Sequence, residues 1–291
     1  MLKEKKEKII FIGVAVLSAI LILCTALIGT KKFYPVEVEA HKTQILFLGD
    51  SNIAYDFEGK DIPELVYDRL GVTTYNGAIG GTSAAKINTE NYFDDRGDMF
   101  CLYNITKVME SGDHNAVADY YGTGSQREKE AVGKVMMLTD LRLEEVDYIV
   151  LSYGLNDYTT GRPIYAEDPY AEYTYAGALR AAVERLQKLC PNAKIILSSI
   201  TYCAFMEGGE VVMDGYERNW GGGTIEEYRD AMELVSSEYE NVYFMDNLEY
   251  LGIGRDNYEQ YLRDEMHLNE AGREIYVDYL EETINGIEGE L

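Results

Sequence analysis

The sequence has few basic residues for its size. Among 291 residues, 26 are Lys or Arg and 51 are Asp or Glu, which gives a formal net charge of −25. A surface this negative repels phosphate backbones and anionic lipid headgroups, so we expect no nucleic acid partner. Hydrophobic residues still make up 46% of the chain and charged residues 26%. This mixture is typical of a folded globular protein.

Cysteine is scarce as well, which limits disulfide and metal chemistry. Three cysteines lie beyond the first 30 residues: Cys101, Cys190 and Cys203. An odd number leaves at least one thiol free or paired with another molecule. Cys190 and Cys203 flank a predicted strand and could form a disulfide, but the connectivity cannot be read from the sequence. No Cys-x-x-Cys pair or His/Cys cluster is present, so we expect no metal site.

Long uncharged segments are missing except near the N-terminus. Residues 1–8 carry four lysines, residues 9–30 carry no charged side chain, and two lysines follow. At ~1.5 Å per residue, a helix over 9–30 is long enough to cross a bilayer core of ~30 Å. The excess of lysines before it favours a cytoplasmic N-terminus and an exported remainder. The alternative, a cleaved signal peptide, would have a shorter apolar region of ~7–15 residues and a small-residue cleavage site.

This pattern divides the chain into four parts. We expect a cytoplasmic segment at residues 1–8, a transmembrane anchor at 9–30, a linker at 31–43 and one extracytoplasmic domain at 44–291, so that the protein is a single-pass cell-membrane protein. Within the domain, residues 91–145 have helical patterns but no obvious strand, and they are longer than a single crossover helix requires. We expect this insertion to form a lid or a side wall.

The rest of the domain alternates short apolar segments with amphipathic ones. Continuous runs of Ile, Leu and Val are typical of parallel strands buried on both faces. Such runs are Ile45–Leu48, Tyr148–Ser152 and Ile195–Ser199, with Thr73–Tyr75 and Val242–Met245 as weaker candidates. Helical patterns lie at Pro63–Leu70, Tyr175–Leu189, Thr224–Tyr239 and about Asn269–Ile287. The order predicts an α/β domain with a mostly parallel sheet of about five strands.

Four motifs lie in loops that could carry chemistry, since such sheets bind ligands at the carboxyl ends of their strands. Gly49–Ser51, Asn76–Ser83 and Gly154–Asp157 follow predicted strands. They offer a serine hydroxyl, glycines that let a backbone N–H approach a ligand, and an asparagine amide. Asp264–His267 precedes the last helix, and its aspartate can accept a hydrogen bond from Nδ1–H and leave Nε2 free as a base. Each motif alone is equally well explained as a turn, a helix cap or a surface pair.

In order, position and residue type, the four motifs together resemble those of GDSL-type esterases, the SGNH hydrolase superfamily. The matching residues are Ser51, Gly81, Asn156, Asp264 and His267. The resemblance spans nearly the whole exported domain and implies a three-layer α/β/α sandwich with a flavodoxin-like fold. The chain departs from the family after Ser51, where Asn52–Tyr55 replace a small or hydroxyl residue followed by glycine. It has no Gly-x-Ser-x-Gly, so an α/β-hydrolase nucleophile is not an alternative.

The resemblance implies a serine esterase with a covalent acyl-enzyme and no metal or organic cofactor. Ser51 would attack the ester carbonyl, His267 would take its proton and Asp264 would orient His267. The N–H groups of Ser51 and Gly81 and the amide of Asn156 would form the oxyanion hole.

The substrate follows from analogy of fold and compartment. We expect short-chain acyl esters, acetyl above all, of a small molecule or of extracellular or cell-wall carbohydrate. Tyr165, Tyr170, Tyr173 and Tyr175 could line a sugar-binding cleft. Two alternatives share the acyl-enzyme: a carbohydrate O-acetyltransferase supplied by a membrane acyltransferase partner, and a lipase or lysophospholipase. A third, a binding module without catalysis, would have no use for a Ser/His/Asp set.

Overall fold

The computed structural model describes residues 42–55, 59–87, 96–115, 117, 124–207 and 210–289. The expected cytoplasmic segment, the anchor at 9–30 and most of the linker lie outside these ranges. Within them, no helix combines the length and the apolar character needed to cross a bilayer. The expected division of the N-terminal part therefore stays a prediction.

A five-stranded sheet forms the centre of the domain. Its strands are β1 (Gln44–Gly49), β2 (Thr73–Asn76), β3 (Tyr148–Ser152), β4 (Lys194–Ser198) and β7 (Val242–Met245). They lie in the order β2–β1–β3–β4–β7, and every neighbouring pair is parallel. Counted within the sheet, this is the 2-1-3-4-5 order of flavodoxin-like folds. The predicted α/β class with a parallel sheet is confirmed.

Position in the sheet explains which strands were easy to predict. The three continuous apolar segments became β1, β3 and β4, the central strands, whose side chains are almost all buried. The two weaker candidates became β2 and β7 at the edges, where most residues are half-buried. An edge strand has a neighbour on one side only, so its sequence needs less apolar surface.

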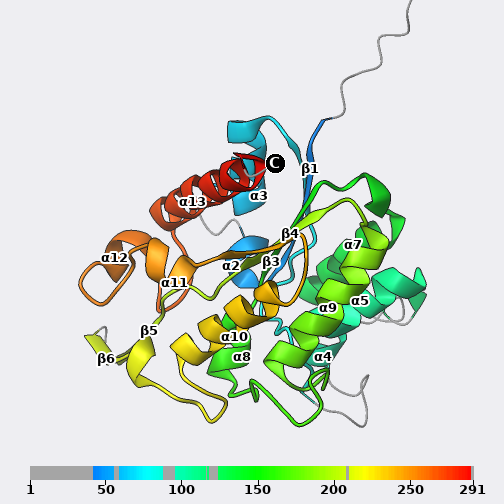
Figure 1. Cartoon of the computed structure of the whole chain (residues 1–291). Helices are drawn as coiled ribbons and strands as arrows, with labels where there is room; N and C mark the ends of the chain where they lie inside the picture. The colour runs from blue at the N-terminus through cyan, green and yellow to red at the C-terminus, as the bar shows by residue number, and fades with distance from the viewer. Residues whose placement is uncertain are drawn as a thin grey trace, which may run out of the picture. The chain divides into compact units, whose positions relative to one another are not determined.

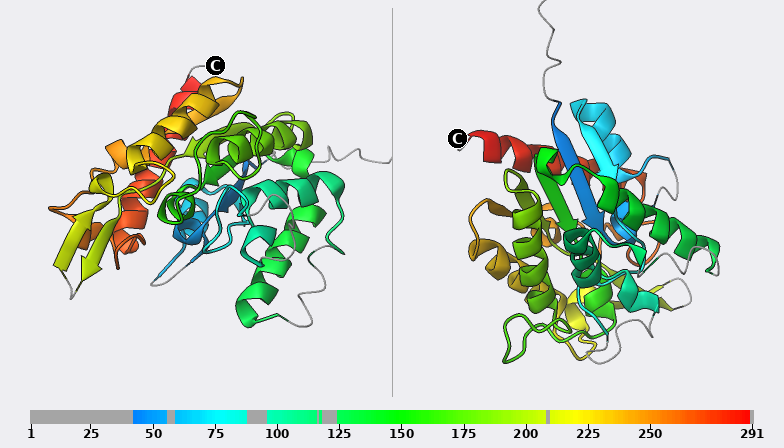
Figure 2. Two further views of the ribbon diagram at one scale, coloured as in Figure 1. Left: turned by 90° about the horizontal axis from the view of Figure 1, so that it is seen from below. Right: turned by 90° about the vertical axis from the view of Figure 1, so that its right-hand side faces the viewer.

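Helices cover both faces of the sheet (Figure 1). On one side lie α3 (Ile62–Leu70) and α13 (Glu270–Gly289), and on the other α5 (Leu102–Ser111), α7 (Gln126–Asp140), α9 (Tyr175–Leu189) and α10 (Ile225–Ser237). The first two contact each other, α5 contacts both α7 and α9, and α10 packs on α9 and β7. Figure 2 shows the same arrangement from two further directions.

Short elements fill the connections. They are α2 (Ser51–Ala54), α4 (Arg96–Met99), α8 (Leu155–Thr159), α11 (Asn247–Tyr250), α12 (Tyr258–Tyr261) and the 3-10 turns at Leu143–Glu145 and Gly215–Glu217. An antiparallel hairpin, β5 (Ala204–Glu207) with β6 (Glu210–Asp214), was not predicted from the sequence. Its strands are short and show no clean apolar alternation.

The described part of residues 91–145 is helical, and its helices α5 and α7 pack in the layer that covers one face of the sheet. Ser125 caps α7 by accepting a hydrogen bond from the N–H of Glu128, whose carboxylate accepts one from the N–H of Ser125. This capping box satisfies N–H groups that the first helical turn leaves free, so the start of α7 is locally encoded. Val132 and Val135 on its inner face are buried in the core.

The three cysteines are free, buried thiols, so the disulfide considered for Cys190 and Cys203 does not form. Burial raises the pKa of the Cys101, Cys190 and Cys203 thiols to about 12. They are therefore uncharged and poorly nucleophilic at neutral pH.

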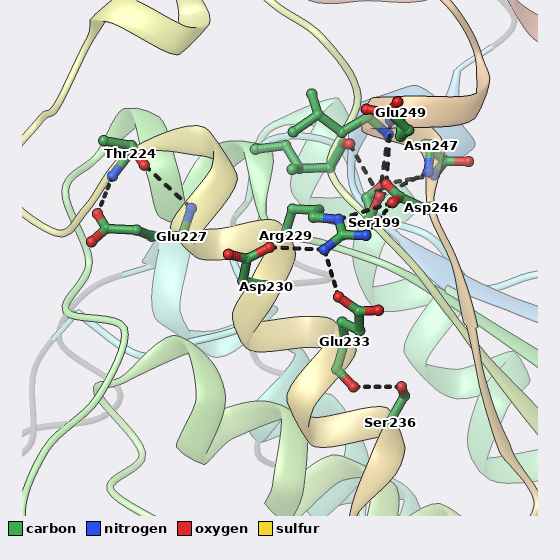
Figure 3. Close-up of polar contacts among 12 residues, drawn as sticks. Ser199, Thr224, Glu227, Arg229, Asp230, Glu233, Ser236, Asp246, Asn247 and Glu249 are labelled. Carbon is green, nitrogen blue, oxygen red and sulfur yellow. Dashed lines mark hydrogen bonds and ion pairs between the residues drawn. The ribbon is translucent and has the colours of Figure 1, made fainter.

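A polar network fixes the carboxyl ends of β4 and β7 (Figure 3). Arg229 of α10 donates through Nε to the Asp246 carboxylate at 2.9 Å, and Asp246 caps α11 by accepting from the N–H of Glu249. The N–H of Asn247 donates to Ser199 Oγ at 2.8 Å. Because Asp246 is buried, the ion pair with Arg229 offsets the cost of removing the carboxylate from water.

Two buried carboxylates organise the ends of β1 and β3. Asp50 caps α2 by accepting from the N–H of Asn52 at 3.0 Å. Asp157 of α8 accepts from the N–H groups of Ala84 and Ala85 at 2.8 and 2.9 Å, which holds the loop after β2 against the end of β3. Burial raises the pKa of Asp50 to about 7 and that of Asp157 to about 6.

Replacing Asp157→Ala should leave two buried N–H groups without an acceptor. At ~1–3 kcal/mol for each unsatisfied group, the free energy of unfolding should fall by about 2–6 kcal/mol. Urea unfolding measures this change. The control is Asp168→Ala, which removes an exposed aspartate that accepts from the N–H of Tyr170 and should cost less than about 1 kcal/mol. Equal losses for both variants would contradict the anchoring role of Asp157.

The raised pKa of Asp50 predicts a pH effect on stability. A carboxyl whose pKa is higher in the folded state makes folding take up a proton, so its contribution is present at low pH and is lost as pH rises. For Asp50 the loss should run from about pH 4 to about pH 7. Asp50→Asn keeps an acceptor for the helix cap and should reduce this fall in unfolding free energy. Chemical unfolding of both proteins from pH 4 to 8 compares the slopes, and identical slopes would show that Asp50 does not titrate in this range.

Candidate active site

Ser51 stands at the turn between β1 and α2, where it is the first residue of the short helix. The turn is tight against β3: a Cβ on Gly49 would lie 2.9 Å from the carbonyl oxygen of Ser152. Glycine therefore lets β1 end close to β3, and the N–H of Asp50 donates to this same carbonyl at 3.2 Å. The position of Ser51 is therefore fixed by the contacts between the end of β1 and the end of β3.

His267 lies between Ser51 and Asp264. Its Nε2 is 2.9 Å from Ser51 Oγ, and its Nδ1 is 2.9 Å from both carboxylate oxygens of Asp264. The N–H groups of Met266 and His267 also donate to Asp264 Oδ1, at 3.0 and 2.9 Å. Partial burial alone would raise the pKa of Asp264, but these hydrogen bonds lower it below its usual value. Asp264 therefore stays anionic and fixes the imidazole with Nε2 toward the serine.

The backbone closes the loop that carries this pair. The N–H of Arg263 donates to the carbonyl of His267 at 2.9 Å, and Leu262 pairs with Leu268 in an isolated β-bridge. The hairpin supports the loop from outside, since the N–H of Ala204 donates to the carbonyl of Glu265 at 2.8 Å. The β5–β6 hairpin is thus part of the wall beside the site.

Asn52 ties the two halves of the site together, and sequence reasoning missed it as a functional residue. Its Oδ1 accepts from the N–H of Leu268 at 2.9 Å, and its Nδ2 donates to the carbonyl of Met266 at 3.3 Å. These two groups flank His267, while Asn52 itself follows Ser51 in α2. The side-chain amide therefore accepts one hydrogen bond from the histidine loop and donates one to it, as a peptide group of an adjacent strand does. The departure of residue 52 from the family pattern was the signal available in the sequence.

Gly81 lies in the loop after β2 with φ at 73°, a conformation that glycine adopts without strain. The loop is held by the N–H of Ile79, which donates to the carbonyl of Gly49 at 2.9 Å, and by the Thr82 hydroxyl, which donates to the carbonyl of Ile79. Within the described part of the chain, the backbone N–H groups of Ser51 and Gly81 have no hydrogen-bond acceptor. Two donors are thus left open at the ends of β1 and β2.

Asn156 lies beside the serine turn, but its amide is already engaged. Nδ2 donates to the carbonyl of Thr82 at 3.1 Å and to Asp50 Oδ2 at 3.4 Å. An oxyanion would have to replace one of these acceptors. The described residues contain no group of three or more His, Cys, Asp or Glu side chains that could hold a metal ion.

Sequence comparison agrees with this geometry. Residues 105–275 match the GDSL-like lipase/acylhydrolase family, a segment that contains Asn156, Asp264 and His267. Ser51 and Gly81 precede it and are brought to the same place by the fold. A comparison with curated proteins finds no significant match.

Solved structures show the same fold at low sequence identity. A Lactobacillus plantarum protein has a TM-score of 0.57 at 18% identity over 84% of this chain and 97% of its own. A possible lipase from Chitinophaga pinensis has a TM-score of 0.55 at 16% identity over 84% and 98%. A salicylyl-acyltransferase of a tetracycline biosynthetic pathway has a TM-score of 0.53 at 15% identity over 86% and 56%. With the family match over more than half of its length, the chain belongs to the GDSL-like lipase/acylhydrolase family and is an acylhydrolase.

Proposed function

We propose that the protein is a serine esterase that hydrolyses short-chain acyl esters, acetyl esters above all, through a covalent acyl-enzyme. One observation carries the proposal: the His267 imidazole lies 2.9 Å from Ser51 Oγ on one side and 2.9 Å from Asp264 on the other. With its proton on Nδ1, the ring directs a lone pair at the serine hydroxyl. General base catalysis requires this arrangement.

Acylation would begin when Ser51 Oγ attacks the carbonyl carbon and its proton passes to His267 Nε2. The Asp264 carboxylate would stabilise the imidazolium that forms. Collapse of the tetrahedral intermediate breaks the bond to the alcohol oxygen, which leaves with the proton from His267. Water then repeats these steps on the acyl-serine and releases the acid.

The open N–H groups of Ser51 and Gly81 are the proposed oxyanion donors. Asn156 would be the third if its amide turned from Asp50, the more distant of its two acceptors, toward the oxyanion. Donors of this kind contribute ~2.7–4 kcal/mol each to stabilisation of the transition state.

The surroundings of the site support a short acyl group and a sugar alcohol. Ile79, Phe100 and Ala131 line a cavity of about 260 Å³ beside Gly81, but Arg127 and Glu128 also line it, and a long alkyl chain would lie against these charges. Tyr165, in the loop after α8, is an exposed aromatic residue that suits stacking on a sugar ring. Tyr175, expected in the same cleft, is instead buried and contacts Tyr228 at 5.2 Å between ring centres.

We further propose that the domain acts outside the cell membrane, tethered through residues 9–30. The lysine distribution around that segment supports this orientation. Its substrate would be a small-molecule or polysaccharide ester, and no cofactor takes part in the steps above.

Ser51→Ala should abolish turnover of p-nitrophenyl esters from acetyl to octanoyl, because no other group replaces the nucleophile. We expect the wild-type chain, purified at full length, to prefer acetyl, and the variant to lose at least ~10³-fold in kcat/KM. Ser111→Ala, an exposed serine on α5, is the matched control and should keep full activity. Hydrolysis that persists in Ser51→Ala would overturn the mechanism. An acyl-serine that accumulates and is released by added glycan would instead favour the acetyltransferase.

Asn52→Ala should lower kcat by roughly 10–100-fold with little change in KM, because a displaced His267 still leaves the binding surfaces intact. The control is Asn257→Ala, since Asn257 likewise bridges a backbone N–H and a carbonyl, those of Gly254 and Gly252, away from the site. Steady-state kinetics and the histidine ring resonances in NMR separate positioning from stability. A loss of stability with unchanged kcat and ring resonances would refute the positioning role.

A further inference from the structure

The insertion helix α7 places two cations beside the candidate site. Arg127 and Lys134 lie two helical turns apart on one face of α7, with the small Ala131 between them. The Arg127 guanidinium donates to the carbonyl of Gly80, and the Lys134 ammonium donates to the carbonyl of Ala78. Both side chains therefore reach the loop that follows β2.

Two cavities of about 260 and 280 Å³ lie between α7 and this loop. Their shared lining residues are Ile79, Gly80, Arg127 and Ala131. Gly81 lines the first cavity, and Tyr55 and Lys134 line the second. A group bound in the first cavity would therefore lie next to Gly81, whose N–H we propose as an oxyanion donor.

These two cations form no ion pair with a described carboxylate, and the carboxylates of Asp61 and Glu130 act on Lys134 only from farther away. Within the described ranges, no carboxylate lies within ion-pair distance of Arg127 or Lys134. Glu128 and Glu130 also line the cavities, but Glu128 accepts from the N–H of Ser125 and Glu130 from the side-chain amide of Gln126. Burial lowers the pKa of Lys134, so its ammonium would be stabilised by a bound anion.

We propose that Arg127 and Lys134 form a subsite for a carboxylate group of the substrate. The inference rests on the proposed esterase function and specifies its substrate class as esters of acidic molecules. A guanidinium binds a carboxylate through two parallel hydrogen bonds, and a lysine adds a compact charge. The carboxylate belongs either to an O-acetylated acidic sugar or to the free end of a dicarboxylic acyl group.

The test compares kcat/KM for three esters: neutral p-nitrophenyl acetate, mono-p-nitrophenyl glutarate and O-acetylated galacturonic acid. We expect Arg127→Gln to lower the ratio of a charged to the neutral ester at least ~10-fold, since charge-assisted hydrogen bonds have about this effect. Arg127→Lys should restore part of the ratio. Lys129→Gln removes a charge from the same helix at a position that lines neither cavity, and it should leave all rates unchanged.

The outcomes separate the two proposals. A fall for glutarate alone places the carboxylate in the acyl group, and a fall for the acetylated uronate alone places it in the alcohol. Unchanged ratios in Arg127→Gln, with Ser51-dependent hydrolysis of the neutral ester, would show that the subsite is wrong and the esterase right. If no ester is hydrolysed, the subsite is tested by calorimetric binding of glutarate and galacturonate to the full chain. Binding that Arg127→Gln weakens supports the subsite, and no binding overturns it.

Discussion

The contact between Ser51 and His267 is the constraint on which the rest of the structure depends, because its two residues are 216 positions apart. A proton transfer tolerates errors of only ~0.5 Å in such a pair. The parallel sheet fixes Ser51 at the end of β1, but His267 comes from a loop before the last helix. Asn52 fixes the position of this loop, because its side chain pairs with the backbone on both sides of the histidine. Serine and base are thus positioned by adjacent residues of one short helix.

Two buried carboxylates hold the serine turn and the loop after β2 by accepting backbone N–H groups. Asp50 and Asp157 are buried almost completely, and burial raises the pKa of both. The cost of burying these carboxylates is offset because both accept backbone N–H groups, Asp50 from Asn52 in α2 and Asp157 from the loop after β2. Asp157 in particular fixes Ala84 and Ala85, a few residues beyond Gly81. This anchor adds to the hydrogen bonds of Ile79 and Thr82 that hold the glycine loop, and it leaves the N–H of Gly81 open.

The sequence predicted the features that depend on local sequence and missed those that depend on contacts between distant residues. Buried parallel strands have continuous apolar sequences, so β1, β3 and β4 were predicted within a residue or two, and their ends located the four motifs. The β5–β6 hairpin was missed because its strands are short and part-exposed. Asn52 and Arg127 were missed because their roles depend on partners distant in sequence, the loop around His267 and the carbonyl of Gly80. The hydrogen bonds of the Asn156 amide with Asp50 and Thr82 could not be predicted either, because both acceptors are distant from Asn156 in sequence.

The net charge of −25 raises the question of how an acidic substrate would approach this domain. Charges farther away than the Debye length of ~8 Å at physiological ionic strength are largely screened, so most surface carboxylates act weakly on a bound group. Arg127 and Lys134 act at contact distance, where screening is small, and the part of the chain described by the structure gives them no ion pair with a carboxylate. The acidic surface therefore repels the substrate during its approach, whereas Arg127 and Lys134 attract its carboxylate once it is bound. Added salt would speed association while weakening the bound complex, opposite effects that a neutral ester would not show.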